Sequence, residues 1–441
     1  MSTYKEIENY LDTFINYEKK IFFPYQKSLK LGRVRHLFQV LKIPYQELNV
    51  VHIAGTKGKG SVATFLAYLL AFSRYKIGLY TSPHFYNFRE RIKVLEKINS
   101  QVKETLISKR EVVTIVEKFK PYLESLRYSP QWGKLTFFEV YTALALYFFC
   151  QQNLDFTILE VGLGGRLDAT NIVTPLVSVI THIGYDHTQK LGKRLKDIAY
   201  EKAGIIKEGI PVVSSWQRPA VLEVIKNRAK ALNAPLYILG KEFNFSRARV
   251  KSNYTFFDFW FNKTKIPNLK IALKGLHQVE NASLALATLL LLLKKKEVKY
   301  PTIKEALSTT SLEGRFEIVK TQPLIILDIA HNPSSFAALA STLEKYFPTR
   351  KIILIFAVSK DKDVKKMLNK IKFKKIILTS FSNPRSLHPD KIARVAGLKE
   401  PIVTGEPREA LKVALRLYNR DSLILVSGSL FLVAEVKKLL L

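Results

Sequence analysis

The stretch VVHIAGTKGKGS, residues 50–61, decides the fold of this chain. Its first part, Val50–Ala54, is a short apolar run typical of a buried strand, and the apolar run 61–71 after the glycines predicts a helix. Glycines between a strand and a helix let backbone N–H groups converge on phosphate oxygens at the helix N-terminus. Lys59 is placed to reach the outer phosphates of a nucleotide. We therefore predict a nucleotide-phosphate loop rather than an ordinary glycine-rich turn.

Length and composition describe a globular chain with more than one domain. Its 441 residues exceed one ordinary core, and 47% hydrophobic with 24% charged residues suits folded domains. The longest apolar stretch, residues 284–293, is too short to span a bilayer. The charged N-terminus does not fit a secretory signal. The single cysteine, Cys150, reads as a buried small hydrophobe and excludes a disulfide within the chain. We expect a cytoplasmic protein with no membrane partner.

The chain is strongly basic. Seventy Lys and Arg residues against 37 Asp and Glu give a formal charge of +33, which favours acidic partners such as nucleotides, polycarboxylates, nucleic acid or anionic membranes. The lysines are spread along the whole sequence, with short clusters at residues 294–296 and 372–375. Charge alone does not choose among these partners. Because no single arm or stripe gathers the charge, we interpret it as a feature of composition and expect no nucleic-acid partner.

Strand, turn and helix patterns recur along the chain. Continuous apolar runs at residues 156–161 and 177–183 are typical of parallel strands covered on both faces. Residues 237–273 alternate aromatic and polar side chains, which predicts a small antiparallel patch, and a helix is expected over 281–294. A second series of units follows Gly314. Its predicted strands are 324–328, 352–356, 376–379 and 423–426, and its predicted helices are 335–346, 364–371 and 408–418.

These patterns predict an α/β fold in two parts. We expect an N-terminal ATP-binding domain over residues 1–313 that contains the phosphate loop and the small antiparallel β patch. A hinge linker is predicted over 314–322. A smaller C-terminal domain, residues 323–441, is predicted to be Rossmann-like and doubly wound.

The strand before the loop resembles the start of the Mur ligase superfamily, and the loop 55–61 resembles that of folylpolyglutamate synthases in particular. Many bacterial members carry Asn at the third loop position, where this chain has Lys57, as eukaryotic members do. Further segments similar to the family follow in the expected order: 80–84, 88–92, 160–171, 186–188, 191–192, 201–204, 276–281, 314–315 and 328–332. The resemblance implies a Mur ligase-like central domain and a C-terminal glutamate-ligase domain.

The same resemblance implies an ATP-dependent, ADP-forming ligase of the folylpolyglutamate synthase and dihydrofolate synthase family. Such an enzyme adds L-glutamate to a folate polyglutamate, to dihydropteroate, or to both, through an acyl phosphate. Because a carboxylate and a phosphoryl group must meet, metal ions and fixed cations are needed to neutralise the encounter. The implied cofactors are ATP and two Mg²⁺ ions, and a monomer is expected.

Individual site residues are carried over on matching positions. The residues implied for ATP are Gly55, Thr56, Gly58, Lys59, Gly60, Ser61, Asn281, Arg315 and Asp328. Those implied for metal are Ser82, Glu160 and His187; those implied for catalysis are Lys59, Lys202, Glu160, His187 and His331. Those implied for the pterin-bearing substrate or the glutamate are Thr136, Leu167, Asp168, Ala169 and Ser429.

Two of these residues have simpler interpretations, and a third has a rival. Taken alone, His187 would be interpreted as a hydrogen-bonded loop histidine. Its place in the run Asp-His-Thr favours the metal and catalytic roles. Lys202 would read as a surface charge, although relatives often carry a carbamylated lysine there. Glu139, which follows two aromatic residues, is a rival carboxylate to Glu160, but Glu160 ends an apolar strand and has the better spacing to His187.

Other functions fit these motifs less well. The run 162–165 resembles a dinucleotide fingerprint but lacks its third glycine, because residue 167 is leucine. A Mur-type ligase for a UDP-muramyl peptide is disfavoured, because only about fifty residues precede the loop, too few for a UDP-binding domain. A nucleic-acid-associated ATPase would leave the runs 160–171 and 328–332 unexplained. An inactive homologue does not fit the intact site residues. The residues leave open whether one or both folate activities are present.

Overall fold

The computed structural model describes residues 2–17, 23–127, 129–251, 254–293 and 299–441. The described chain divides into two compact units. The first comprises Met1–Arg247, Phe257–Lys270 and Glu280–Thr310, and the second comprises Ala248–Phe256, Ile271–Val279 and Ser311–Leu441. The lysine cluster 294–296 lies outside the described residues.

The first unit is built on an eight-stranded sheet in the order β4-β3-β2-β5-β1-β6-β7-β8. The bounds are β1 Val50–Ala54, β2 Ile77–Tyr80, β3 Ile92–Ile98, β4 Gln101–Leu106, β5 Phe156–Glu160, β6 Val177–Ile180, β7 Val212–Ser214 and β8 Leu236–Ile238. Strands β2, β5, β1, β6, β7 and β8 run parallel to one another, whereas the pairs β2 with β3 and β3 with β4 are antiparallel. The carboxyl ends of the parallel strands therefore meet at one edge, where α/β sheets bind ligands.

Helices cover this sheet because its strands are buried on both faces. Their bounds are α1 Tyr4–Asp12, α2 Tyr25–Ser28, α3 Leu31–Val40, α4 Lys59–Phe72, α5 Lys109–Arg127, α6 Phe137–Cys150, α7 Thr188–Leu191, α8 Leu195–Ala203, α9 Pro219–Ala231, α10 Leu276–Leu292 and α11 Tyr300–Thr309, with short 3₁₀ turns η1 Tyr45–Glu47, η2 Phe88–Arg91 and η3 Ala169–Ile172. Helix α4 is buried around nearly its whole circumference, which explains its continuous apolar sequence.

Val50, His52 and Ala54 lie on one face of β1, because side chains alternate along a strand. Val50 joins the cluster formed with α1, α3, α5 and α6, and Ala54 joins the cluster formed with α8 and α9. Between them, on the same face, His52 is fully buried. Cys150, expected to be buried, is only partly so, and burial raises the pKa of its thiol to about 11.

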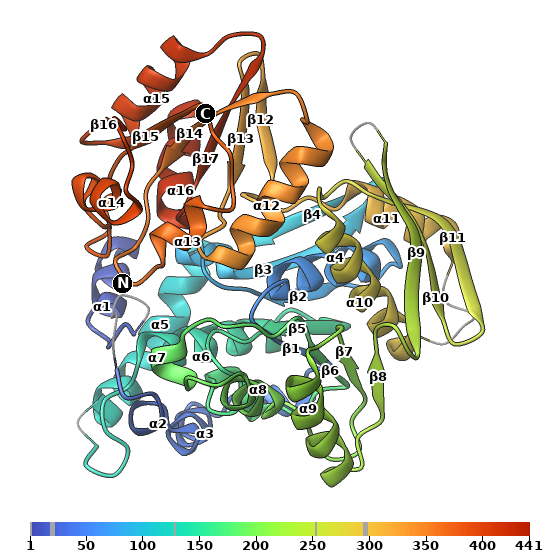
Figure 1. Ribbon diagram of the computed structural model, residues 1–441. Helices are drawn as coiled ribbons and strands as arrows, with labels where there is room; N and C mark the ends of the chain where they lie inside the picture. The colour runs from blue at the N-terminus through green and yellow to red at the C-terminus, as the bar shows by residue number, and fades with distance from the viewer. Residues whose placement is uncertain (1, 18–22, 128, 252–253, 294–298) are drawn as a thin grey trace. The chain divides into compact units, whose positions relative to one another are not determined.

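A separate three-stranded sheet is formed by β9 Phe243–Lys251, β10 Tyr254–Phe261 and β11 Thr264–Ile271, in the order β11-β10-β9 (Figure 1). Only two residues connect β10 to β11, and a connection that short joins antiparallel strands. The antiparallel patch predicted within residues 237–273 is confirmed.

The second unit carries a six-stranded sheet in the order β12-β13-β17-β14-β15-β16. Its strands are β12 Glu317–Thr321, β13 Leu324–Asp328, β14 Lys351–Phe356, β15 Lys375–Leu378, β16 Ile402–Val403 and β17 Ser422–Ser427, and its helices are α12 Pro333–Tyr346, α13 Val364–Leu368, α14 Pro389–Ala396, α15 Pro407–Leu417 and α16 Leu430–Leu440. All strand pairs except β12 with β13 are parallel. The predicted doubly wound α/β fold is confirmed. Within the segment predicted as a linker, 314–322, the structure places strand β12.

None of the helices in the described part of the chain is long and apolar enough to cross a bilayer.

Candidate active site

The glycine-rich loop joins β1 to α4, and two of its glycines have no room for a side chain. Gly55 has φ +151°, and a Cβ there would lie 1.8 Å from Thr181 Oγ1. Gly58 caps α4 with φ +86°, and a Cβ there would lie 2.3 Å from Asn281 Oδ1. The loop therefore packs closely against the end of β6 and against α10. This contact brings the sequence-predicted Asn281 to the phosphate loop.

The backbone of the loop is held from the β6 side. The N–H groups of Thr56 and Lys57 both donate to the carbonyl of His182, at 3.0 and 3.2 Å. Thr56 Oγ1 also lies 3.1 Å from the carbonyl oxygen of Gly184. The N–H groups of the first turn of α4, which includes Gly60 and the buried Ser61, have no acceptor within the helix by geometry, and such groups bind phosphate oxygens.

The carboxylate of Glu160 lies beside the loop. Glu160 ends β5 and is only 4% exposed. Its Oε1 lies 3.8 Å from Lys59 Nζ, and its Oε2 accepts a hydrogen bond from the Ser82 N–H at 3.2 Å. A Cβ on Gly60 would come 3.5 Å from the same oxygen. The structure therefore brings together four residues that the sequence predicted for ATP, metal and catalysis: Lys59, Gly60, Ser82 and Glu160.

Lys202, on α8, reaches the loop from the other side. Its side chain is buried, and Nζ donates to the carbonyl of Gly55 at 2.8 Å. Burial lowers the pKa of Lys202 to about 7; the nearby charge of Lys59 acts in the same direction, and Asp186 opposes it. A lysine with that pKa is partly uncharged at neutral pH, so its amine is available for reaction. Burial also lowers the pKa of Lys57 to about 8, against the opposing effect of Asp186.

One pocket contains most of these groups. It is lined by Gly55, Thr56, Lys59, Val161, Gly162, Leu163, Gly164, Asp186, His187 and Lys202. His187 is exposed and begins α7 with φ +50°, a left-handed conformation uncommon outside glycine. The predicted catalytic residues Lys59, Lys202 and His187 thus share a pocket, with Glu160 beside Lys59. Within the described part of the chain, no three His, Cys, Asp or Glu side chains form a ready-made metal cluster.

The predicted substrate residues around position 168 hold the loop that carries them. The buried carboxylate of Asp168 accepts hydrogen bonds from the Leu163 N–H at 2.9 Å, the Thr170 N–H at 3.1 Å and the Thr170 hydroxyl at 2.6 Å. Burial raises the pKa of Asp168, and the Thr170 hydroxyl opposes that rise. Leu167 is partly exposed and Ala169 is buried. Direct contact of these residues with a substrate stays a prediction.

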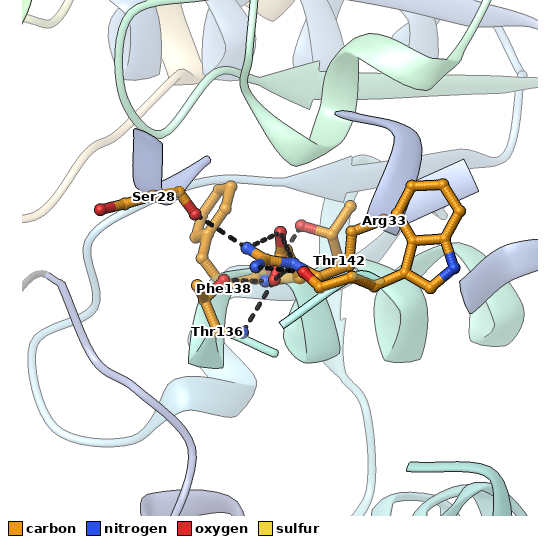
Figure 2. Close-up of polar contacts among 7 residues, drawn as sticks. Ser28, Arg33, Thr136, Phe138 and Thr142 are labelled. Carbon is orange, nitrogen blue, oxygen red and sulfur yellow. Dashed lines mark hydrogen bonds and ion pairs between the residues drawn. The ribbon is translucent and has the colours of Figure 1, made fainter. Parts of the chain in front are cut away.

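Thr136 and the rival carboxylate Glu139 form the first turn of α6. Thr136 caps the helix and is paired with Glu139 in a capping box. Figure 2 shows Arg33 reaching towards this turn. Arg33 donates two hydrogen bonds to Oε1 of Glu139, from Nη2 at 2.7 Å and from Nε at 3.0 Å. Its Nη2 also donates to the carbonyl of Ser28 at 3.0 Å. Glu139 is thus buried and paired with Arg33, and it is not among the residues that line the pocket at the phosphate loop.

In the second unit, the predicted residues lie at the carboxyl edge of the sheet. Asp328 ends β13, where its carboxylate accepts from the N–H groups of Phe316 and Ala330 at 2.9 and 2.8 Å. Burial raises the pKa of Asp328, and Arg315 opposes the rise. His331 Nδ1 lies 2.9 Å from the carbonyl of Ile329, which orients the ring. The buried Ser429 follows the neighbouring strand β17 and caps α16, accepting from the Phe431 N–H at 3.2 Å.

A lysine-lined pocket on the same edge was missed by the sequence reasoning. It lies at the carboxyl ends of β14 and β15 and is lined by Lys360, Lys362, Val364, Ser380, Ser386, Leu387, His388, Lys391 and Val395. Lys362 lies 3.0 Å from Asp361, and Lys360 donates to the carbonyl of Pro384 at 2.9 Å. The lining includes no carboxylate. The alternating Lys and Asp residues directly after the buried strand 351–356 were the signal that could have found it.

Comparison with known proteins covers both parts of the chain. Residues 133–289 match the family described as Mur ligase middle domain, and residues 314–430 match that described as Mur ligase, glutamate ligase domain. The chain is 32% identical over 413 residues to a dihydrofolate synthase/folylpolyglutamate synthase of Bacillus subtilis, covering 92% of this chain and 94% of the relative. It is 31% identical to a folylpolyglutamate synthase of Lacticaseibacillus casei, covering 93% and 94%.

Solved structures give the same similarity in three dimensions. The folylpolyglutamate synthase of Thermotoga maritima superimposes with a TM-score of 0.84 at 33% identity, covering 99% of this chain and 96% of that one. The Mycobacterium tuberculosis enzyme complexed with ADP gives a TM-score of 0.89 at 28% identity, covering 99% and 98%. A folylpolyglutamate synthase in complex with AMPPCP and folate gives a TM-score of 0.83 at 28% identity, covering 100% of both chains.

Proposed function

Because this chain belongs to the folylpolyglutamate synthase and dihydrofolate synthase family of the Mur ligases, we propose that it uses ATP to join L-glutamate to the carboxylate of a folate or pteroate. The observation that carries the proposal is the grouping of Lys59, Glu160 and Lys202 around the phosphate loop. A site of this kind has to bring a polyphosphate and a carboxylate together, and its fixed cations lower the cost of that encounter.

The reaction proceeds in two balanced steps. An oxygen of the substrate carboxylate attacks the γ-phosphorus of ATP, the bond from that phosphorus to ADP breaks, and an acyl phosphate and ADP are formed. The amine of glutamate then attacks the acyl carbon, phosphate leaves, and the amine nitrogen gives up a proton. Lys59 and the N–H groups at the start of α4 hold the phosphates during the first step. We also assign binding of the nucleotide to Arg315 and Asp328. We assign removal of the amine proton to His331.

The donor set beside the loop suits magnesium. Mg²⁺ is bound in nucleotide sites by one or two carboxylates together with phosphate oxygens and water. Glu160, with Ser82 directly beside its carboxylate, provides such a partial shell. When bound, the ion would neutralise charge on the phosphate oxygens. A second ion near His187 would require an anionic ligand in place of an ammonium, and the buried Lys202, with its pKa near 7, is the residue that could supply it as a carbamate.

The lysine-lined pocket of the second unit suits the amino-acid substrate. Glutamate carries two carboxylates and a short aliphatic chain, and the pocket offers Lys360, Lys362 and Lys391 around the apolar side chains of Val364 and Leu387. It lies on the same sheet edge as His331 and Ser429, because β13, β17 and β14 are consecutive neighbours. We propose that Lys391 and Lys360 bind the glutamate carboxylates.

The experiment offers dihydropteroate, tetrahydrofolate and a UDP-muramyl peptide in parallel to the purified protein with ATP, Mg²⁺ and labelled glutamate. Labelled product from either or both of the first two is expected. Product from the UDP-muramyl peptide alone would overturn the folate assignment. The product pattern also decides between one and two folate activities.

We further propose that the protein is a cytoplasmic monomer and that it has neither nucleic-acid nor membrane partners.

A further inference from the structure

The parts of the ATP site lie in a fixed order along the carboxyl edge of the first sheet. Ile53 of β1 is in register with Glu160 of β5, and on the other side Ala54 is in register with Ile180 of β6, which is in register with Ser214 of β7. Glu160 and Ser82 therefore lie on the β5 and β2 side of the loop, and β6 and β7 lie on its other side.

Trp216 lies on that other side, directly after β7. Two inter-strand spacings separate β7 from β1, roughly 10 Å at about 4.8 Å each. Trp216 is 59% exposed, although tryptophan has the largest apolar surface to bury of any residue. A single exposed aromatic ring is not unusual by itself. What distinguishes Trp216 is how firmly its backbone is tied to the phosphate loop.

Three contacts fix the segment that carries the ring. The Ser215 N–H donates to the carbonyl of Ile180 at 2.9 Å. The buried Gln217 donates to the carbonyl of Thr181 and accepts from the Ile183 N–H, both at 3.0 Å. The carbonyl of His182, which lies between Thr181 and Ile183, accepts the two loop N–H groups described above. Residues 181–183 thus link the segment that carries Trp216 to the phosphate loop.

We propose that the indole of Trp216 is the platform on which the purine base of the nucleotide stacks. The loop holds the phosphates, Glu160 marks the reactive end, and Trp216 presents an exposed aromatic face at the opposite end, on a rigid support. Every base has a π-face, and removing an aromatic partner costs on the order of tenfold or more in affinity. The inference rests on ATP use by the proposed ligase and not on which folate it takes.

The test uses the three tryptophans at positions 132, 216 and 260. In the variant W132F/W260F, Trp216 is the sole indole fluorophore. Saturating ADP is expected to quench its emission, whereas inorganic tripolyphosphate, which has no base, is not. Calorimetry on W216A should show a roughly tenfold weaker Kd for ADP, with tripolyphosphate binding unchanged and W216F close to wild type. Tyr122→Ala, which truncates an exposed aromatic residue on α5, should retain wild-type ADP affinity.

The outcomes separate the two levels of the proposal. If the wild-type protein binds ADP by calorimetry but the emission of Trp216 does not change, or if W216A binds ADP as tightly as wild type, the stacking assignment is wrong and the ligase assignment stands. If the wild-type protein binds no ADP at all, the proposed function fails together with this inference. Should W216A fold poorly, the single-tryptophan variant and W216F still decide the question.

Discussion

The side chain of Lys202 donates a hydrogen bond to the carbonyl of Gly55 at 2.8 Å, so a buried lysine holds the start of the phosphate loop. The low pKa of this amine follows from its burial first and from the nearby charge of Lys59 second. Lys202 therefore both supports the loop and presents an amine of lowered pKa at the pocket.

Lys202→Ala is expected to lower kcat by at least about 100-fold, because it removes a group that touches the loop and faces the pocket. Added small molecules identify the form in which Lys202 acts. If it acts as a carbamate, acetate should restore part of the activity; if it acts as a cation, ethylamine should. Steady-state ADP release with each additive is the measurement. Wild-type kcat in the variant without any additive would contradict a catalytic role.

Glu160→Gln removes the charge that we assign to the metal and keeps the shape of the side chain. Turnover is expected to fall by more than about 100-fold, beyond what loss of a supporting contact gives, and the thermal midpoint should change little. ADP release across a Mg²⁺ titration measures the effect. Wild-type rates in this variant would refute the metal assignment. Glu139→Gln supplies the contrast, since it disturbs the buried pair with Arg33 and should lower stability rather than change the Mg²⁺ dependence.

Gly58→Ala is expected to weaken ADP binding by tenfold or more, because a Cβ would press on Asn281 at 2.3 Å in a backbone conformation with φ +86°. Gly209→Ala is the matched control. Gly209 also has a positive φ, +68°, but a Cβ there meets nothing within 4 Å. Calorimetric titration of both variants separates loss of the nucleotide site from backbone strain alone. Equal ADP affinity in the two variants would contradict the packing argument.

Lys391→Ala should raise the KM for glutamate by about tenfold while the KM for ATP stays within a factor of two, since charge-assisted hydrogen bonds contribute roughly 1.5–3 kcal/mol. Lys412→Ala, an exposed lysine on α15, is the control and should change neither constant. A rise in the KM for ATP with no change for glutamate would rule out the proposed role of the pocket.

The buried His52 is expected to make the stability of the folded chain depend on pH. Its ring is fully buried, Nε2 lies 2.8 Å from the Thr170 hydroxyl, and burial lowers its pKa from 6.5 to about 3. The folded chain therefore keeps His52 neutral between pH 6.5 and pH 3, while the unfolded chain protonates it. Unfolding takes up a proton in that window, so stability falls as pH decreases below 6.5, by up to about 1.4 kcal/mol per pH unit.

Replacing His52 by Gln removes this proton uptake and keeps a donor for Thr170. Between pH 7 and pH 5, wild type should lose roughly 1 to 2 kcal/mol more stability than His52→Gln, as measured by denaturant titration. An identical pH dependence in the two proteins would show that the titration of His52 does not control acid stability.

The sequence was most informative where function depends on consecutive residues. The run from Val50 to Ser61 predicted β1, the loop and α4, and the end of β5 predicted a carboxylate that the structure places 3.8 Å from Lys59. Adjacent parallel strands bring their carboxyl ends together, so residues at successive strand ends were bound to meet.

Contacts between distant residues could not be predicted in this way. Nothing local indicates that Glu139 is held by Arg33, 106 positions away. The lysine-lined pocket depends on the parallel pairing of β14 with β15 and on the start of α14, which the sequence pattern did not reveal. Tertiary packing, rather than local preference, decides these sites.

The oxygen atoms of the substrate carboxylate reveal whether the reaction passes through an acyl phosphate. With heavy oxygen in the reacting carboxylate of tetrahydrofolate or dihydropteroate, an acyl phosphate predicts that one labelled oxygen leaves in the inorganic phosphate formed with each new amide bond. Mass spectrometry of that phosphate gives the answer. Phosphate without the label would contradict ATP-dependent ligation through an acyl phosphate at this site.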